Sequence, residues 1–108
     1  MVNQNLLNSW SNMSLIEQLG NIGSEVGRAA KWQNKDENRF YIAVEKALEL
    51  FDLTFRDKRW FGKLKEIIVA KEVFVDAVLG GREYKSSLPD LERYFMQFAL
   101  LAMRSQTN

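Results

Sequence analysis

The chain contains no cysteine and no histidine among its 108 residues. Without cysteine there is no disulfide framework and no thiol nucleophile, and the two absences together exclude the usual structural zinc sites. They also exclude histidine-based catalytic triads and the di-iron sites of helical bundles, which need Glu-x-x-His pairs. We therefore expect no cofactor and, because no common catalytic motif is present, a non-catalytic protein.

An excess of charge and a long apolar run are also missing. Lys and Arg number 15 against 14 Asp and Glu, so no global charge draws the chain to nucleic acid or anionic lipid. No stretch of about 18 apolar residues indicates a transmembrane helix. The first thirteen residues lack the basic start and apolar core of a signal peptide, so we expect a cytoplasmic protein with no membrane partner.

Proline occurs once, at Pro89, and apolar residues recur at spacings of three and four in consecutive stretches. We predict one all-α domain, an up-and-down four-helix bundle formed by residues 14–108. A short N-terminal arm, residues 1–13, is expected to lay its apolar side chains on the bundle. The predicted helices span residues 14–32, 34–57, 58–79 and 87–104, and their short connections favour antiparallel neighbours.

Start and stop signals mark the predicted helix ends. They are Ser14 with Glu17, Asn34 with Glu37, Gly80 with Gly81, and Ser87 with Pro89 and Asp90. In the first helix, Gln18 and Glu25 fall on the polar face opposite the apolar one. In the third, Ile68 and Val75 fall in the apolar stripe.

Lys71 lies at the centre of that apolar stripe. A bare ammonium group there is costly unless it is paired or neutralised. One interpretation is that the aliphatic stem is buried while the charged end reaches water at a seam between helices. The other is a buried pair with a carboxylate from another helix.

Three glycines, Gly20, Gly23 and Gly27, lie on one edge of the first predicted helix. Each costs about 1 kcal/mol relative to alanine inside a helix. The cost indicates a close approach by another helix, for which Phe40 and Phe51 are candidate partners. A ligand or subunit lying in the same groove is the alternative.

Three carboxylates share one face of the second predicted helix: Glu45, Glu49 and Asp52. Oxygen ligands so placed could hold a magnesium ion. The all-α nucleotide pyrophosphohydrolases use Glu-x-x-Glu and Glu-x-x-Asp pairs on helices, and Glu49 with Asp52 matches one pair. A metal-dependent nucleotide hydrolase is therefore the alternative function, although the first helix lacks the second pair. The competing interpretation is a solvated face paired with Lys46.

Five cations cluster between the second and third predicted helices: Arg56, Lys58, Arg59, Lys63 and Lys65. Cations of this kind hold phosphates while an aromatic ring such as Trp60 stacks on a base. This turn is therefore a candidate site for nucleic acid or a protein partner. A second basic group, around Arg28 and Arg39, falls at the opposite end of an up-and-down bundle, which divides the positive charge between two poles.

Apolar residues also occur opposite the predicted core stripes, where a solitary bundle should be polar. They are Val69, Val73, Ile42, Leu53, Leu100 and Leu101. We therefore predict a homo-oligomer and, as its function, a self-associating helical interaction protein that binds a protein partner or nucleic acid.

Two stretches of the chain resemble known protein sequences: residues 19–29 (LGNIGSEVGRA) and 47–54 (ALELFDLT). From residue 14 to about residue 104 the chain resembles a group of small bacterial and archaeal helical proteins. More remotely, it is similar to the four-helix proteins encoded in ribosomal-RNA intervening sequences. The resemblance implies a helical fold that forms oligomers, with nucleic-acid-binding relatives, and it transfers no catalytic motif.

Overall fold

The computed structural model describes residues 4–106, all but the two ends of the chain, and includes no side-chain detail for residues 105 and 106. These residues form five α-helices and one 3-10 turn. They are α1 (Gln4–Ser11), α2 (Leu15–Trp32), α3 (Glu37–Arg56), a 3-10 turn η1 (Lys58–Trp60), α4 (Lys65–Val78) and α5 (Leu88–Gln106). The described residues form no strand, which confirms the all-α prediction. Residues 4–106 contain five α-helices rather than four, so the up-and-down four-helix bundle is not confirmed.

Helix α1 is the element that the sequence pattern did not predict. We expected an arm over residues 1–13, and residues 4–11 of it form a helix with Trp10 buried at its end. Short polar helices are marginal in water on their own. This one is anchored by its contact with α2, where the Gln18 amide donates to the Trp10 carbonyl oxygen at 3.0 Å.

Local signals explain most helix ends. Ser14 and Glu17 form the expected reciprocal capping box at the start of α2. Ser87 and Asp90 exchange the same two bonds at the start of α5. Gly80 and Gly81 follow α4 with φ values of +117° and +75°, a conformation that glycine adopts without strain.

Two predicted helix starts were wrong. Helix α3 is capped by Asp36, whose carboxylate accepts from the Arg39 N–H, while Asn34 takes a left-handed conformation in the preceding turn. The third predicted helix does not begin at Lys58. Asp57 caps a single 3-10 turn there, Gly62 breaks the chain direction at φ +85°, and α4 begins only at Lys65.

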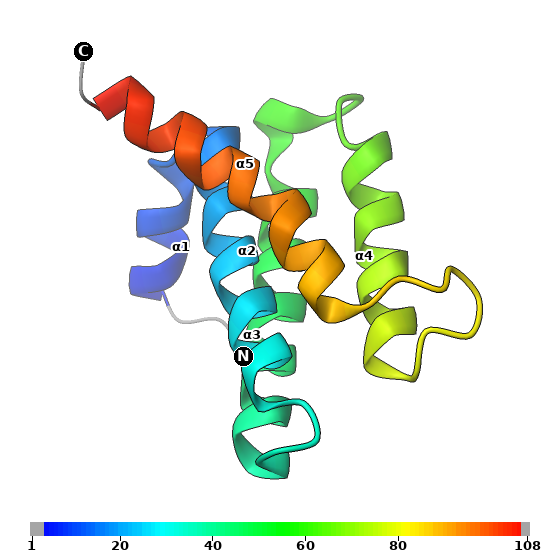
Figure 1. Ribbon diagram of the computed structural model, residues 1–108. Helices are drawn as coiled ribbons and strands as arrows, with labels where there is room; N and C mark the ends of the chain where they lie inside the picture. Colours follow the sequence, from blue (N-terminus) through cyan, green and yellow to red (C-terminus); the bar gives the residue numbers. More distant parts are fainter. Residues whose placement is uncertain (1–3, 107–108) are drawn as a thin grey trace.

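Helix α2 is the centre of the packing, with α3 and α5 lying closely against it and α4 packing much less closely on α3 and α5 (Figure 1). Three fully buried phenylalanines join the helices: the ring of Phe51 on α3 lies 5.9 Å from those of Phe74 on α4 and Phe95 on α5. A hydrogen bond also connects α5 with α4, because the Tyr94 hydroxyl donates to the Glu66 carboxylate at 2.6 Å. Helix α4 is thus held by a few large side chains, not by close backbone approach.

The three glycines of α2 all face α5. A Cβ on Gly20 would lie 3.2 Å from the Cα of Ala99, and one on Gly23 only 2.5 Å from the Cβ of Phe95. A Cβ on Gly27 would meet the carboxylate of Glu92. The close approach expected from the sequence therefore involves α5, and not Phe40 or Phe51.

Several predicted orientations were also wrong. Gln18 and Glu25, expected on the polar face of α2, are buried, and Leu53 of α3, expected outside, is buried as well. Ile68 and Val75 of α4, expected in the core, are exposed. The fifth helix and the loose packing of α4 on α3 and α5 change which faces are covered.

Candidate functional site

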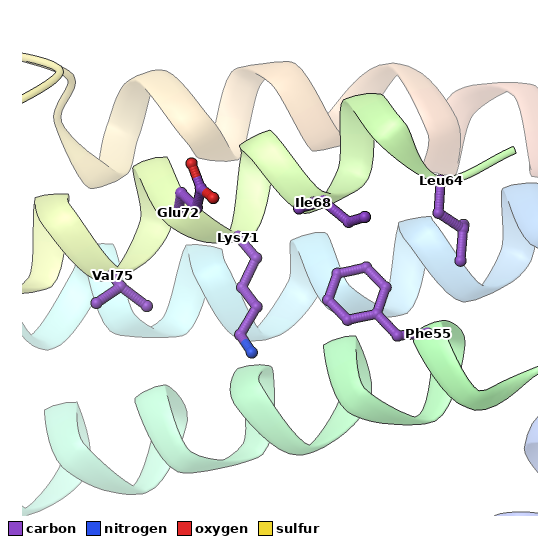
Figure 2. A pocket seen from close by; sticks show the side chains of 6 residues that line it. All are labelled: Phe55, Leu64, Ile68, Lys71, Glu72 and Val75. Carbon is purple, nitrogen blue, oxygen red and sulfur yellow. The ribbon is translucent and has the colours of Figure 1, made fainter. Parts of the chain in front are cut away.

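An open groove runs between α3 and α4 and has a volume of about 590 Å³ (Figure 2). Its lining is mostly apolar, and ligand or partner sites commonly have this size and character. The lining residues are Phe55 on α3 with Leu64, Ile68, Lys71, Glu72 and Val75 on or beside α4. We call this the α3–α4 groove.

The groove exists because α4 carries two neighbouring apolar stripes. One stripe, Ile67, Ala70, Phe74 and Ala77, is buried in the core. The other continues from Leu64 through Ile68 and Val75 to Leu79, at spacings that place these side chains along one side of the helix. Ile68 is 49%, Val75 37% and Leu79 75% exposed. We call Ile68, Val75 and Leu79 the outer stripe, and no described residue covers it.

Lys71 lies between Ile68 and Val75 and extends from α4 toward α3 (Figure 2). It is partly buried, and its Nζ lies 5.7 Å from the ring centroid of Phe55. Within the described chain, it forms no ion pair with a carboxylate. Its side chain thus places one positive charge in a groove whose lining is mostly apolar.

Glu72 points away from α3, on the other side of α4 from Lys71 (Figure 2). The Tyr84 hydroxyl donates to its Oε2 atom at 2.9 Å, and this carboxylate raises the pKa of Tyr84 above its usual value. The loop that carries Tyr84 is fixed in turn, because the carboxylate of Asp76 accepts from the N–H groups of Glu83 and Tyr84. Glu72 is therefore an oriented carboxylate at the edge of the groove.

The five cations of the predicted basic turn have different surroundings. Arg56 pairs with Asp52 at 3.0 Å, and Arg59 binds both Asp57 and the Met13 carbonyl oxygen, the latter at 2.9 Å. Arg59 also lies 4.4 Å over the ring of Trp60. Lys58, Lys63 and Lys65 are exposed. Two of the five cations are thus engaged within the chain, Arg56 by a local pair on α3 and Arg59 by contacts that reach Met13, which leaves a smaller basic surface than the sequence indicated.

The second basic group comes together at the turn between α2 and α3. The guanidinium of Arg39 lies 4.6 Å, and Nζ of Lys31 5.0 Å, from the ring centroid of Trp32. A pocket of about 270 Å³ beside them includes Arg28 and Lys46. Arg28 is paired with Glu25, which moderates the positive charge of this pocket.

Asp57 caps η1 and accepts a hydrogen bond from Gln18 of α2. Its lowered pKa predicts that the stability of the protein falls at acid pH. The hydrogen bond from the Arg59 side chain, and a weaker one from Gln18, hold the pKa of Asp57 at about 2, although burial opposes the shift. Because this pKa is lower in the folded than in the unfolded state, Asp57 stabilises the protein above about pH 4. That contribution is lost as the pH falls toward about 2.

We therefore expect the stability difference between the wild type and an Asp57→Asn variant to shrink steadily as the pH is lowered through this range. Urea denaturation followed by circular dichroism at a series of pH values measures it. A difference that stayed constant with pH would show that the charge of Asp57 contributes nothing.

The carboxylates of Glu45, Glu49 and Asp52 do not form a metal site. No group of three or more metal-ligating side chains is close enough to hold an ion in the part of the chain that the structure describes. Asp52 is instead paired with Arg56. The residues present therefore do not favour the nucleotide-hydrolase alternative.

The apolar residues expected on outer faces are mostly found there. Val69, Ile42, Leu100 and Leu101 are exposed, whereas Val73 is partly buried against the core and Leu53 is buried. The outer stripe of α4 was missed. Its signal was the width of the apolar arc on α4, which is too large for one buried stripe.

No helix of the described residues is both long and apolar enough to cross a membrane. Comparison of the chain with protein-family models, curated proteins and solved structures finds no match.

Proposed function

We propose that the protein is a non-catalytic helical interaction protein that self-associates, and that the outer stripe beside the α3–α4 groove is the surface that it uses. The observation that carries this proposal is the row Ile68, Val75 and Leu79, which lies along one side of α4 and its C-cap and stays exposed among the described residues. Burial of a side chain of this type contributes about 1.5–3 kcal/mol. A row of three beside a groove is a surface suited to a partner helix.

The proposed partner is protein and not nucleic acid. The groove is lined mainly by aliphatic and aromatic groups, whereas a nucleic-acid site needs several cations that are free to contact phosphates. At the basic turn, Arg56 and Arg59 are already engaged within the chain. A protein surface therefore explains the exposed groups better.

Light scattering tests self-association directly. We expect the wild-type chain to exceed its monomer mass of 12.6 kDa at high protein concentration. An Ile68→Glu variant should shift to the monomer, because a carboxylate in the outer stripe would be buried without a partner.

Val69→Glu is the matched control, since it places the same charge on the same helix outside the groove. It should leave the mass unchanged. A wild-type mass of 12.6 kDa at millimolar concentration would contradict the proposal, and so would an equal response of the two variants.

A further inference from the structure

Lys71 and Glu72 carry opposite charges on opposite sides of the outer stripe. With 3.6 residues per turn, each lies about 50° from the line through Ile68 and Val75, one to either side. Figure 2 shows this arrangement, with Lys71 directed toward α3 and Glu72 directed away from it. Any helix laid along the outer stripe would therefore meet a positive edge and a negative edge.

When the covering helix belongs to a second copy of the chain, symmetry decides which edges meet. If the two-fold axis runs parallel to the α4 helices, the α3-facing edge of one copy meets the opposite edge of the other. Lys71 of each copy then faces Glu72 of its partner, at nearly the same height along the helix. If the helices are antiparallel, identical edges meet, so lysine faces lysine and glutamate faces glutamate.

We propose that two copies of this chain pair through parallel α4 helices, with Lys71 of each copy bound to Glu72 of the other. This inference rests on the proposed function and names its partner and geometry. Ile68, Val75 and Leu79 of the two copies would meet in register along the seam. The pairing supplies the carboxylate that Lys71 lacks within its own chain, and it creates two such ion pairs per dimer.

The surroundings of both groups suit this pairing. Lys71 is partly buried in the groove, with its Nζ 5.7 Å from the centroid of the Phe55 ring, so part of its side-chain freedom is already lost before pairing. Glu72 is oriented by Tyr84 through one carboxylate oxygen, and a carboxylate accepts several hydrogen bonds. Two oriented, oppositely charged groups at a dry seam favour one arrangement over the other.

Cysteine cross-linking distinguishes the two geometries, and it is clean because the chain has no cysteine of its own. Ile68→Cys and Leu79→Cys are made as separate single variants and treated with a short bis-maleimide. Parallel pairing brings each cysteine next to the same cysteine of the second copy, so both variants should cross-link. The two positions are eleven residues apart, roughly 16 Å along a helix. An antiparallel pair could therefore cross-link at most one of them.

Ser24→Cys is the control for random collision, because it is exposed on α2 outside the groove. It should remain uncross-linked under the same conditions. Cross-linking at only one of positions 68 and 79 would overturn the parallel arrangement while leaving self-association intact.

Charge reversal tests the ion pair. We expect Lys71→Glu alone, and Glu72→Lys alone, each to raise the dimer dissociation constant about tenfold or more, because attraction becomes repulsion. The double variant Lys71→Glu with Glu72→Lys should restore it toward the wild-type value. Lys46→Glu on α3 changes the net charge by the same amount as Lys71→Glu but lies outside the groove. It should have little effect on the dimer dissociation constant.

The outcomes separate the two proposals. A monomeric wild type overturns the proposed function and this inference together. A stable dimer whose double variant is no better than the single ones overturns only the Lys71–Glu72 pairing.

Discussion

Replacement of Gln18 by leucine is expected to destabilise the protein by about 3 kcal/mol or more, because several buried polar groups lose their partners at once. The Gln18 amide nitrogen donates to the Trp10 carbonyl oxygen and to Asp57, each at 3.0 Å. Its carbonyl oxygen accepts from the Thr54 hydroxyl and the Trp60 indole N–H, also at 3.0 Å. All the hydrogen-bonding capacity of this fully buried side chain is used.

The loss should extend beyond α2, since the four partners come from α1, α3 and the segment around η1. Urea denaturation gives the change in free energy of unfolding. Tryptophan fluorescence of a variant in which Trp10 and Trp32 are replaced by phenylalanine gives a local readout, because the indole N–H of Trp60 would lose its acceptor. Gln97→Leu, an exposed change of the same type on α5, is the control and should lie within about 0.5 kcal/mol of the wild type. An equally small effect at Gln18 would show that the network contributes little net stability.

Replacement of Gly23 by alanine is expected to cost about 2 kcal/mol, although alanine is the better helix former by about 1 kcal/mol. The new Cβ would lie 2.5 Å from the Cβ of Phe95, which is fully buried and in contact with Phe51. A Cβ is the rigid start of a side chain, so α5 itself would have to move. The intrinsic gain in helix propensity is smaller than this packing penalty.

Gly27→Ala is the matched control within the same helix. Its Cβ would also approach a neighbour at 2.5 Å, but that neighbour is Oε2 of Glu92, at the end of a flexible and only partly buried side chain. The glutamate can rotate away, so we expect Gly27→Ala to be neutral or stabilising by up to about 1 kcal/mol. Thermal and urea denaturation of both variants decide the matter. A stabilising Gly23→Ala would mean that the α2–α5 contact is looser than its geometry indicates.

The predicted features that rest on local chemistry were confirmed. The capping pairs Ser14–Glu17 and Ser87–Asp90 form, and the chain turns after α4 at Gly80 and Gly81, because these signals act within a few residues. The wrong helix starts at Asn34 and Lys58 have different causes. At Asn34 two possible caps lie close together, and Asp36 is the one used. At Lys58 only one 3-10 turn forms after Asp57, because the chain changes direction at Gly62 and α4 begins at Lys65 without a side-chain cap.

The α3–α4 groove could not be predicted from the sequence, for a different reason. Periodicity shows how wide the apolar arc of a helix is, but not which part of it neighbouring helices cover. On α4 the arc includes both Phe74 and Val75, and only the large rings between α3, α4 and α5 determine that Phe74 is buried and Val75 is not. Lys71 was singled out by its apolar neighbours, yet its position beside Phe55 at the α3–α4 groove could not be inferred from them.

By itself, the sequence determined that the chain is helical, where most of its helices begin and end, and which kinds of metal and thiol chemistry are absent, because composition and short-range hydrogen bonding decide these properties. Only the tertiary structure decided that residues 4–11 form a fifth helix, that Gln18 is a buried polar centre, and that α4 leaves an apolar groove open. These properties depend on contacts between residues far apart in the chain, and such contacts leave no trace in local spacing.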